Sequence, residues 1–173
     1  MNEKPVTVWS TALRYGLIVG LISVIYSLIL SLTDNSMNRA LSSISYLFII
    51  GGMVMAFKYF KEHNGGFMRY GQGLGIGTLM SLIAGFITSL FMYIYVKFID
   101  TTLMDRAMEM QRAQMEEAGT MSDEEIEMAI EMGSKFSTPE LAFVSAIIGL
   151  IIVGFLMSLV IAAAMRNPRP EFE

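Results

Sequence analysis

Four long stretches without any charged residue constrain this chain more than any other feature. They cover residues 15–33, 40–57, 70–96 and 141–165, so each holds between 18 and 27 residues. An α-helix needs about 20 apolar residues to cross the roughly 30 Å hydrocarbon core of a bilayer, and it satisfies its own backbone hydrogen bonds there. The pattern predicts an all-α, polytopic four-helix transmembrane bundle with spans at about 13–33, 40–57, 71–96 and 141–165.

The composition supports this class of protein. Apolar residues make up 54% of the 173 residues and charged residues 16%, whereas a soluble domain carries about 25% charged residues. The same numbers exclude disordered and collagen-like chains, and the absence of cysteine excludes disulfides and thiolate zinc sites. We expect one membrane domain over residues 1–173, with residues 98–140 as its only sizeable insert.

The first stretch also resembles a secretory signal peptide, because basic residues precede it. Its apolar run is longer than that of a signal peptide, and no small-residue cleavage site follows it. We therefore predict that it is a retained span.

The distribution of Lys and Arg predicts the orientation. With four spans, both termini and the loop between the second and third spans lie on one side, which holds seven basic residues: Lys4, Arg14, Lys58, Lys61, Arg69, Arg166 and Arg169. The other side holds five over a far longer segment: Arg39, Lys97, Arg106, Arg112 and Lys135. The positive-inside rule then predicts cytoplasmic termini, with the short 34–39 turn and residues 98–140 external.

The insert is predicted to be an acidic helical hairpin. Residues 97–140 contain eleven Asp or Glu and four Lys or Arg. Residues 102–118 are rich in helix formers, Gly119 marks a helix end, and Ser122 with Glu125 forms a capping-box pattern. The last span is predicted to begin near Ser137 and Thr138, with Pro139 at its first helical position.

The apolar face of this hairpin is our candidate partner-binding surface. Its residues are Met104, Met108, Met115, Ile126 and Ile130. Thioether ligands also suit copper(I), but no His or Cys accompanies the methionines, so a flexible docking face is the favoured interpretation. The acidic residues are typical of a solvated helix face and lack the Gly and Asn/Asp spacing of calcium loops. We expect no metal site and no cofactor.

Small residues recur every four positions within the spans. Such stripes allow two helices to approach closely in lipid, where no hydrophobic force drives them together. The stripes pack either on each other, which is the favoured interpretation, or on a second copy. The predicted helix-packing residues are Gly16, Gly20, Gly73, Gly77, Ser81, Gly85, Ser89, Gly154 and Ser158.

No Asp, Glu, Lys, Arg or His lies in the central part of any predicted span. Proton relays, ion pathways and voltage sensors normally place such groups there. The sequence also contains no recognisable pairing of a nucleophile with a base, so we predict no catalytic residues and no enzyme.

Several segments resemble one bacterial membrane family. They are NGGFMRYGQGLGIG at 64–77, YIYVKFID at 93–100, QMEE at 114–117 and FSTP at 136–139. The chain resembles, over nearly its whole length, the family catalogued as domain of unknown function 4199. The resemblance implies a four-helix inner-membrane protein with no assigned activity and no catalytic residue to transfer.

Two functions remain open at this point. The first is a non-enzymatic membrane component for assembly or partner binding, and the second is an oligomeric small-solute transporter or channel. An enzyme acting on lipids is a weaker third alternative. The expected partners are the lipid bilayer and either a second copy or another membrane protein, and no nucleic acid.

Overall fold

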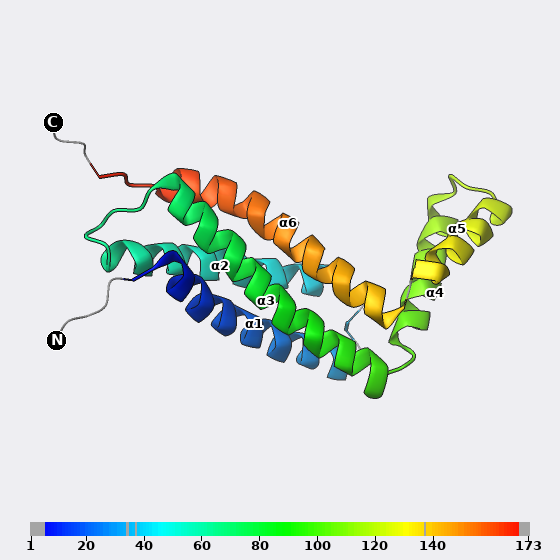
Figure 1. Cartoon of the computed structure of the whole chain (residues 1–173). Coiled ribbons are helices and arrows are strands. Elements are labelled where there is room, and N and C mark those ends of the chain that lie inside the picture. Colours follow the sequence, from blue (N-terminus) through cyan, green and yellow to red (C-terminus); the bar gives the residue numbers. More distant parts are fainter. Residues whose placement is uncertain (1–5, 34, 37, 137, 170–173) are drawn as a thin grey trace. The chain divides into compact units, whose positions relative to one another are not determined.

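The computed structural model describes residues 6–33, 35–36, 38–136 and 138–169. Lys4, Asp34 and Ser137, which entered the predictions of orientation, external turn and helix cap, lie outside these residues. Six helices follow one another along the chain, and the described residues contain no β-sheet (Figure 1). They are α1 (Val8–Leu32), α2 (Arg39–Glu62), α3 (Tyr70–Phe98), α4 (Leu103–Ala118), α5 (Asp123–Phe136) and α6 (Pro139–Met165).

Four of these helices, α1, α2, α3 and α6, are long and apolar enough to cross a membrane. The all-α architecture with an inserted helical hairpin is therefore confirmed. Each long helix starts earlier or ends later than the corresponding predicted span. The extension of α3 carries Lys97 and that of α6 carries Glu140, and these two side chains form an ion pair at 2.9 Å.

The helix ends follow from local sequence. Thr7 caps α1, since its Oγ1 accepts a hydrogen bond from the Ser10 amide at 3.0 Å. Thr138 begins α6 in the same way, because its Oγ1 accepts a hydrogen bond from the Leu141 amide at 3.3 Å, with Pro139 at the first helical position. This part of the predicted cap is confirmed.

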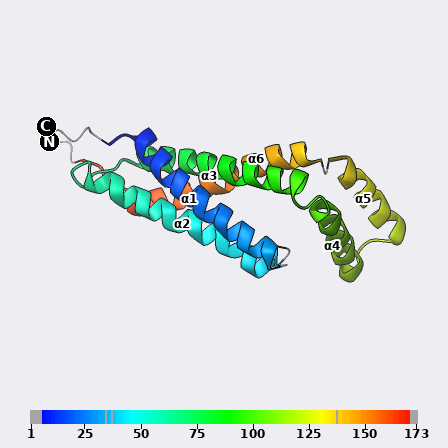
Figure 2. The same ribbon diagram turned by 90° about the horizontal axis from the view of Figure 1, so that it is seen from below.

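The chain divides into two compact units, which we describe separately. The bundle unit comprises residues 1–88 and 147–173, and the hairpin unit comprises residues 89–146. In the bundle unit α1 lies alongside α2, and in the hairpin unit α4 lies alongside α5 (Figures 1 and 2).

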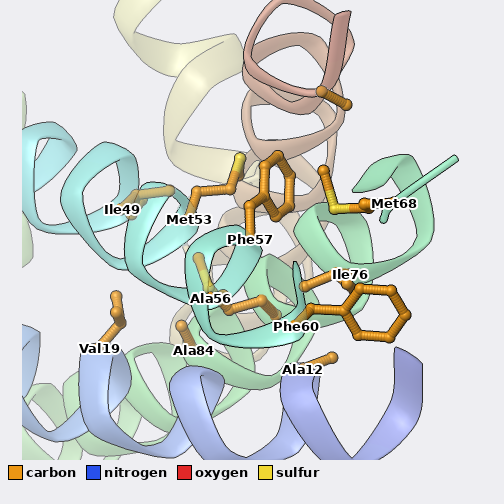
Figure 3. Close-up of a cluster of buried hydrophobic side chains, with 12 residues drawn as sticks. Ala12, Val19, Ile49, Met53, Ala56, Phe57, Phe60, Met68, Ile76 and Ala84 are labelled. Atoms are coloured by element: carbon orange, nitrogen blue, oxygen red, sulfur yellow. The ribbon is translucent and has the colours of Figure 1, made fainter. Parts of the chain in front are cut away.

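The core of the bundle unit is centred on α2. Met53 and Phe57 have no exposed surface and lie among side chains from neighbouring helices, including Val19 of α1 and Ile76 of α3 (Figure 3). A helix that buries one face in this way leaves its other faces to the surroundings.

The outward face of α6 is a continuous row of large apolar side chains. Ile148, Ile152, Leu156 and Val160 follow one another at four-residue intervals, and all are more than half exposed. On the same helix Gly154, Ser158 and Ala162 are buried. Small residues inside and large apolar residues outside is the arrangement expected of a helix whose surroundings are lipid.

A short backbone pairing closes one end of the bundle unit. The Met68 amide donates to the Asn167 carbonyl at 2.8 Å, and the Asn167 amide donates back to the Met68 carbonyl at 2.9 Å. The Asn167 side-chain amide also donates to the Gly66 carbonyl at 2.9 Å. We call this pairing the clasp, because it joins the loop between α2 and α3 to the end of α6.

Candidate functional site

The hairpin is a folded element whose turn is fixed by two local devices. Gly119 ends α4 with a φ of 60°, in the left-handed region that glycine enters without steric cost. Ser122 then begins α5 with the predicted capping box, which the structure confirms. The carboxylate of Glu125 accepts from the Ser122 amide at 2.8 Å and from its hydroxyl at 3.0 Å.

These hydrogen bonds also affect ionisation. They stabilise the charged form of the carboxylate, so the backbone and hydroxyl donors of Ser122 hold the pKa of Glu125 below its ordinary value. The first turn of α5 therefore carries a firmly ionised group beside Asp123 and Glu124, where the helix dipole favours negative charge.

The predicted partner-binding residues are largely covered within the hairpin unit. Ile126 is 2% exposed, and Met104, Met108, Met115 and Ile130 are half-buried. They lie on the apolar helix faces that the periodicity of the sequence predicts. An apolar face on one helix, however, does not show whether that face packs within the hairpin or on a partner.

A different set of methionines is open. Met128 and Met132, one turn apart on α5, are 64% and 58% exposed. Glu124 and Glu131, which lie four residues before and three residues after Met128, are exposed as well. We call this combination the acidic methionine strip. Sequence reasoning missed it because Met128 and Met132 lie off the dominant apolar face of α5.

The hairpin unit retains a large excess of negative charge after all its internal pairings. Each of its four cationic side chains pairs with one carboxylate: Lys97 with Glu140, Arg106 with Asp100, Arg112 with Glu116 and Lys135 with Glu131. Seven acidic residues of this unit have no ion pair within the described residues: Asp105, Glu109, Glu117, Asp123, Glu124, Glu125 and Glu127. Within that part of the chain, no three acidic or histidine side chains gather in a way that holds a metal ion.

An ionic and aromatic cluster joins the end of α3 to the start of α6. The Lys97 ammonium donates to the Glu140 carboxylate at 2.9 Å and to the Tyr93 hydroxyl at 2.6 Å. That hydroxyl donates in turn to Glu140 at 3.3 Å, and the Tyr93 ring lies 5.8 Å from the ring of Phe143. The sequence carries a signal for this pair, because Lys97 and Glu140 are the charged residues that directly flank the third and fourth uncharged stretches.

Most of the predicted small residues lie at close contacts between helices of the bundle unit. On α3, a Cβ atom at Gly73 would lie 2.8 Å from the Cβ atom of Ala162, and one at Gly77 would lie 2.5 Å from that of Ser158. A Cβ atom at Gly154 would collide with the side chain of Ser81. These partners all come from the same chain.

The stripe of α1 meets α3 in the same way. A Cβ atom at Gly16 would lie 2.8 Å from the Cβ atom of Ile83, and one at Gly20 would lie 3.0 Å from Cδ1 of Ile87. Gly85 of α3 approaches Leu150 of α6, at 3.2 Å by the same measure. Ser89, the last member of the predicted stripe, belongs to the hairpin unit, where it is buried.

A small cavity inside the bundle unit is lined by hydroxyl-bearing residues. Its volume is about 60 Å³, and Ser23 and Ser27 of α1, Ser45 of α2 and Ser81 and Thr88 of α3 contribute to its wall. The Ser81 hydroxyl has no hydrogen-bond partner there, whereas Thr88 donates to the Ala84 carbonyl. The lining contains no charged residue.

Comparison with known proteins identifies the family. The model of the family described as "Protein of unknown function (DUF4199)" matches residues 14–167. The chain belongs to this family. No curated protein and no solved structure matches the chain. The family match covers all six helices except the first turns of α1, and it extends from the bundle unit through the hairpin.

Proposed function

We propose that this chain is a non-enzymatic, multi-pass component of a bacterial inner membrane whose external hairpin binds a partner protein. The membrane assignment is supported by four helices of sufficient length and apolar character. It is also supported by the row of exposed apolar residues on α6, since such a row is stable against lipid and unfavourable in water.

The proposed orientation follows the positive-inside rule, with both termini cytoplasmic and residues 98–140 external. Because the chain has no native cysteine, it can be tested with single substitutions. An impermeant maleimide applied to intact cells should label Thr120→Cys and leave Glu62→Cys unlabelled until the membrane is opened. The reverse pattern would invert the topology.

One observation carries the partner-binding proposal, namely the acidic methionine strip on an ordered helix. Exposed methionine provides an adaptable apolar contact, and Glu124, together with the neighbouring unpaired carboxylates of α5, favours a basic surface, whereas Glu131 already pairs with Lys135. We therefore propose a protein partner that offers a basic, partly apolar patch, either on a second copy of this chain or on another membrane protein.

The test is site-specific photocrosslinking in intact membranes. A photoreactive amino acid at position 128 should give a discrete crosslinked product that weakens as salt is raised. The same amino acid at Met55, an equally exposed position on α2, should give only lipid adducts. Met132→Glu should reduce the product formed at position 128. Identical products from both positions, or none from position 128, would contradict the proposal.

The cavity lined by hydroxyl groups favours a second function, a small-solute transporter or channel acting as an oligomer. Uptake of ions and small metabolites into proteoliposomes tests it directly. Flux above background that Ser81→Leu abolishes would support transport, and background flux for all solutes would reject it.

A further inference from the structure

The hairpin unit contains a second and larger cavity that the proposed function does not use. It is partly open, has a volume of about 150 Å³, and lies where the end of α3, the start of α4 and the start of α6 meet. Its wall includes Met92 and Val96 of α3, Met104 of α4, and Ala142 and Phe143 of α6. An engineered apolar cavity of about this volume in another protein binds benzene.

The wall chemistry excludes a charged occupant. Apart from Ser89 and Tyr93, the side chains that line the cavity are apolar, so a charged group would lose its hydration there without compensation. The Tyr93 hydroxyl is already committed, because it accepts from Lys97 and donates to Glu140. It offers no proton to a ligand.

Ser89 provides the one uncommitted polar group. It lines the cavity, it is 3% exposed, and its hydroxyl has no hydrogen-bond partner among the residues that the structure describes. A buried hydroxyl without a hydrogen-bond partner is unfavourable. A bound water molecule would not satisfy the Ser89 hydroxyl well. An ordered buried water needs two to four polar partners, and the side chains of this wall offer a single free hydroxyl.

We propose that this cavity binds a small neutral amphiphile, with a compact apolar body against Met92, Met104 and Phe143 and one hydroxyl or carbonyl group paired with Ser89. The two methionines suit this task, because their flexible, polarizable side chains adapt to apolar bodies of different shape. The ligand class is therefore that of short alcohols, phenols and similar uncharged molecules.

The experiment uses the full chain in lipid nanodiscs and a diazirine derivative of 1-octanol as the photolabel. Adducts on the peptides that carry Met92 and Met104 should saturate, and benzyl alcohol should compete for them. Ala142→Phe fills the cavity and should abolish the saturable labelling. Ala163→Phe, an exposed position on the same helix, should leave it unchanged.

Ser89→Ala tests the polar contact and only deletes an oxygen atom, so it remains informative if the filled variant does not fold. It should weaken competition by benzyl alcohol about three- to tenfold and leave competition by toluene unchanged, as expected for the loss of one hydrogen bond. Labelling that does not saturate, or that Ala142→Phe leaves intact, would overturn the binding site. Equal effects of Ser89→Ala on both competitors would overturn the proposed recognition of a hydroxyl group.

Discussion

The bundle unit and the hairpin unit are stabilised in different ways. In the bundle, glycine and serine allow helices to approach until backbone and side chain touch, as at Gly77 and Ser158. In the hairpin, caps and exposed i,i+4 ion pairs stabilise each short helix by itself, and Ile126 is buried where α4 and α5 lie side by side. The difference teaches that the bundle should be intolerant of added volume, whereas the hairpin should be sensitive to lost contacts and turn geometry.

The largest effect is expected from added volume in the bundle. Gly154→Leu and Gly77→Leu place side chains where Ser81 and Ser158 already lie, so each should destabilise the bundle by about 3 kcal/mol. Thermal unfolding in detergent, followed by size-exclusion chromatography, measures this.

Matched controls lie on the same two helices. A Cβ atom at Gly149 of α6 or at Gly71 of α3 would have nothing within 4 Å, so replacement of either glycine by leucine should not destabilise the bundle. If all four variants behaved alike, these helix contacts would not determine bundle stability.

The second effect concerns lost contacts in the hairpin. Ile126→Ala removes most of a side chain that is 2% exposed, and it should destabilise the hairpin by about 2–3 kcal/mol. Hydrogen exchange of α4 and α5 amides in the full chain reports this locally. Met128→Ala, two residues away and 64% exposed, serves as the control and should leave exchange nearly unchanged.

The third effect concerns turn geometry. Replacement of glycine by alanine should change stability in opposite directions at two sites of the hairpin. Gly119→Ala places a side chain at a φ of 60° and should destabilise the turn by about 1 kcal/mol. Gly133→Ala adds a methyl group within α5 at a position with nothing within 4 Å, and it should stabilise that helix by up to about 1 kcal/mol. The same exchange measurement compares them, and equal signs would refute the assigned backbone role of Gly119.

The smallest effect is a pH dependence at the start of α5. Because the folded pKa of Glu125 is depressed, its contribution is fully present above the ordinary glutamate pKa and is lost as the pH falls through the folded value. Protection of the first-turn amides of α5, that is, exchange corrected for the intrinsic pH dependence of amide exchange, should therefore fall on acidification within that range. Ser122→Ala removes the hydroxyl donor and keeps the backbone donor, so it should weaken the dependence, and an unchanged pH profile in this variant would contradict a role of the hydroxyl group.

Much of the fold was predictable, because lipid imposes long apolar helices whatever their contacts. Helix existence, the capping box at Ser122 and the stop at Gly119 follow from local sequence, and the structure contains all three. The exact ends of the long helices could not be predicted from the sequence. An ion pair such as that of Lys97 with Glu140 allows a charged residue to lie within the helix, beyond the uncharged stretch.

The candidate site was predictable only in part, for a different reason. The acidity of the hairpin follows from its composition, and its helices follow from the periodicity of its apolar residues. Both features can be read directly from the sequence. Which methionines stay open depends on how α4 and α5 face each other, and Met128 and Met132 show this. Likewise, nothing in the sequence separates Ser89, with its unpaired hydroxyl, from the other serines of the spans.

The clasp has a consequence for how the bundle unit opens. Its two reciprocal hydrogen bonds join residues 68 and 167, which are far apart in the chain, so separation of the two segments breaks both bonds together. The loop that follows α2 and the segment that follows α6 should therefore unfold together. Under increasing denaturant, the amides of Met68 and Asn167 should begin to exchange at the same concentration.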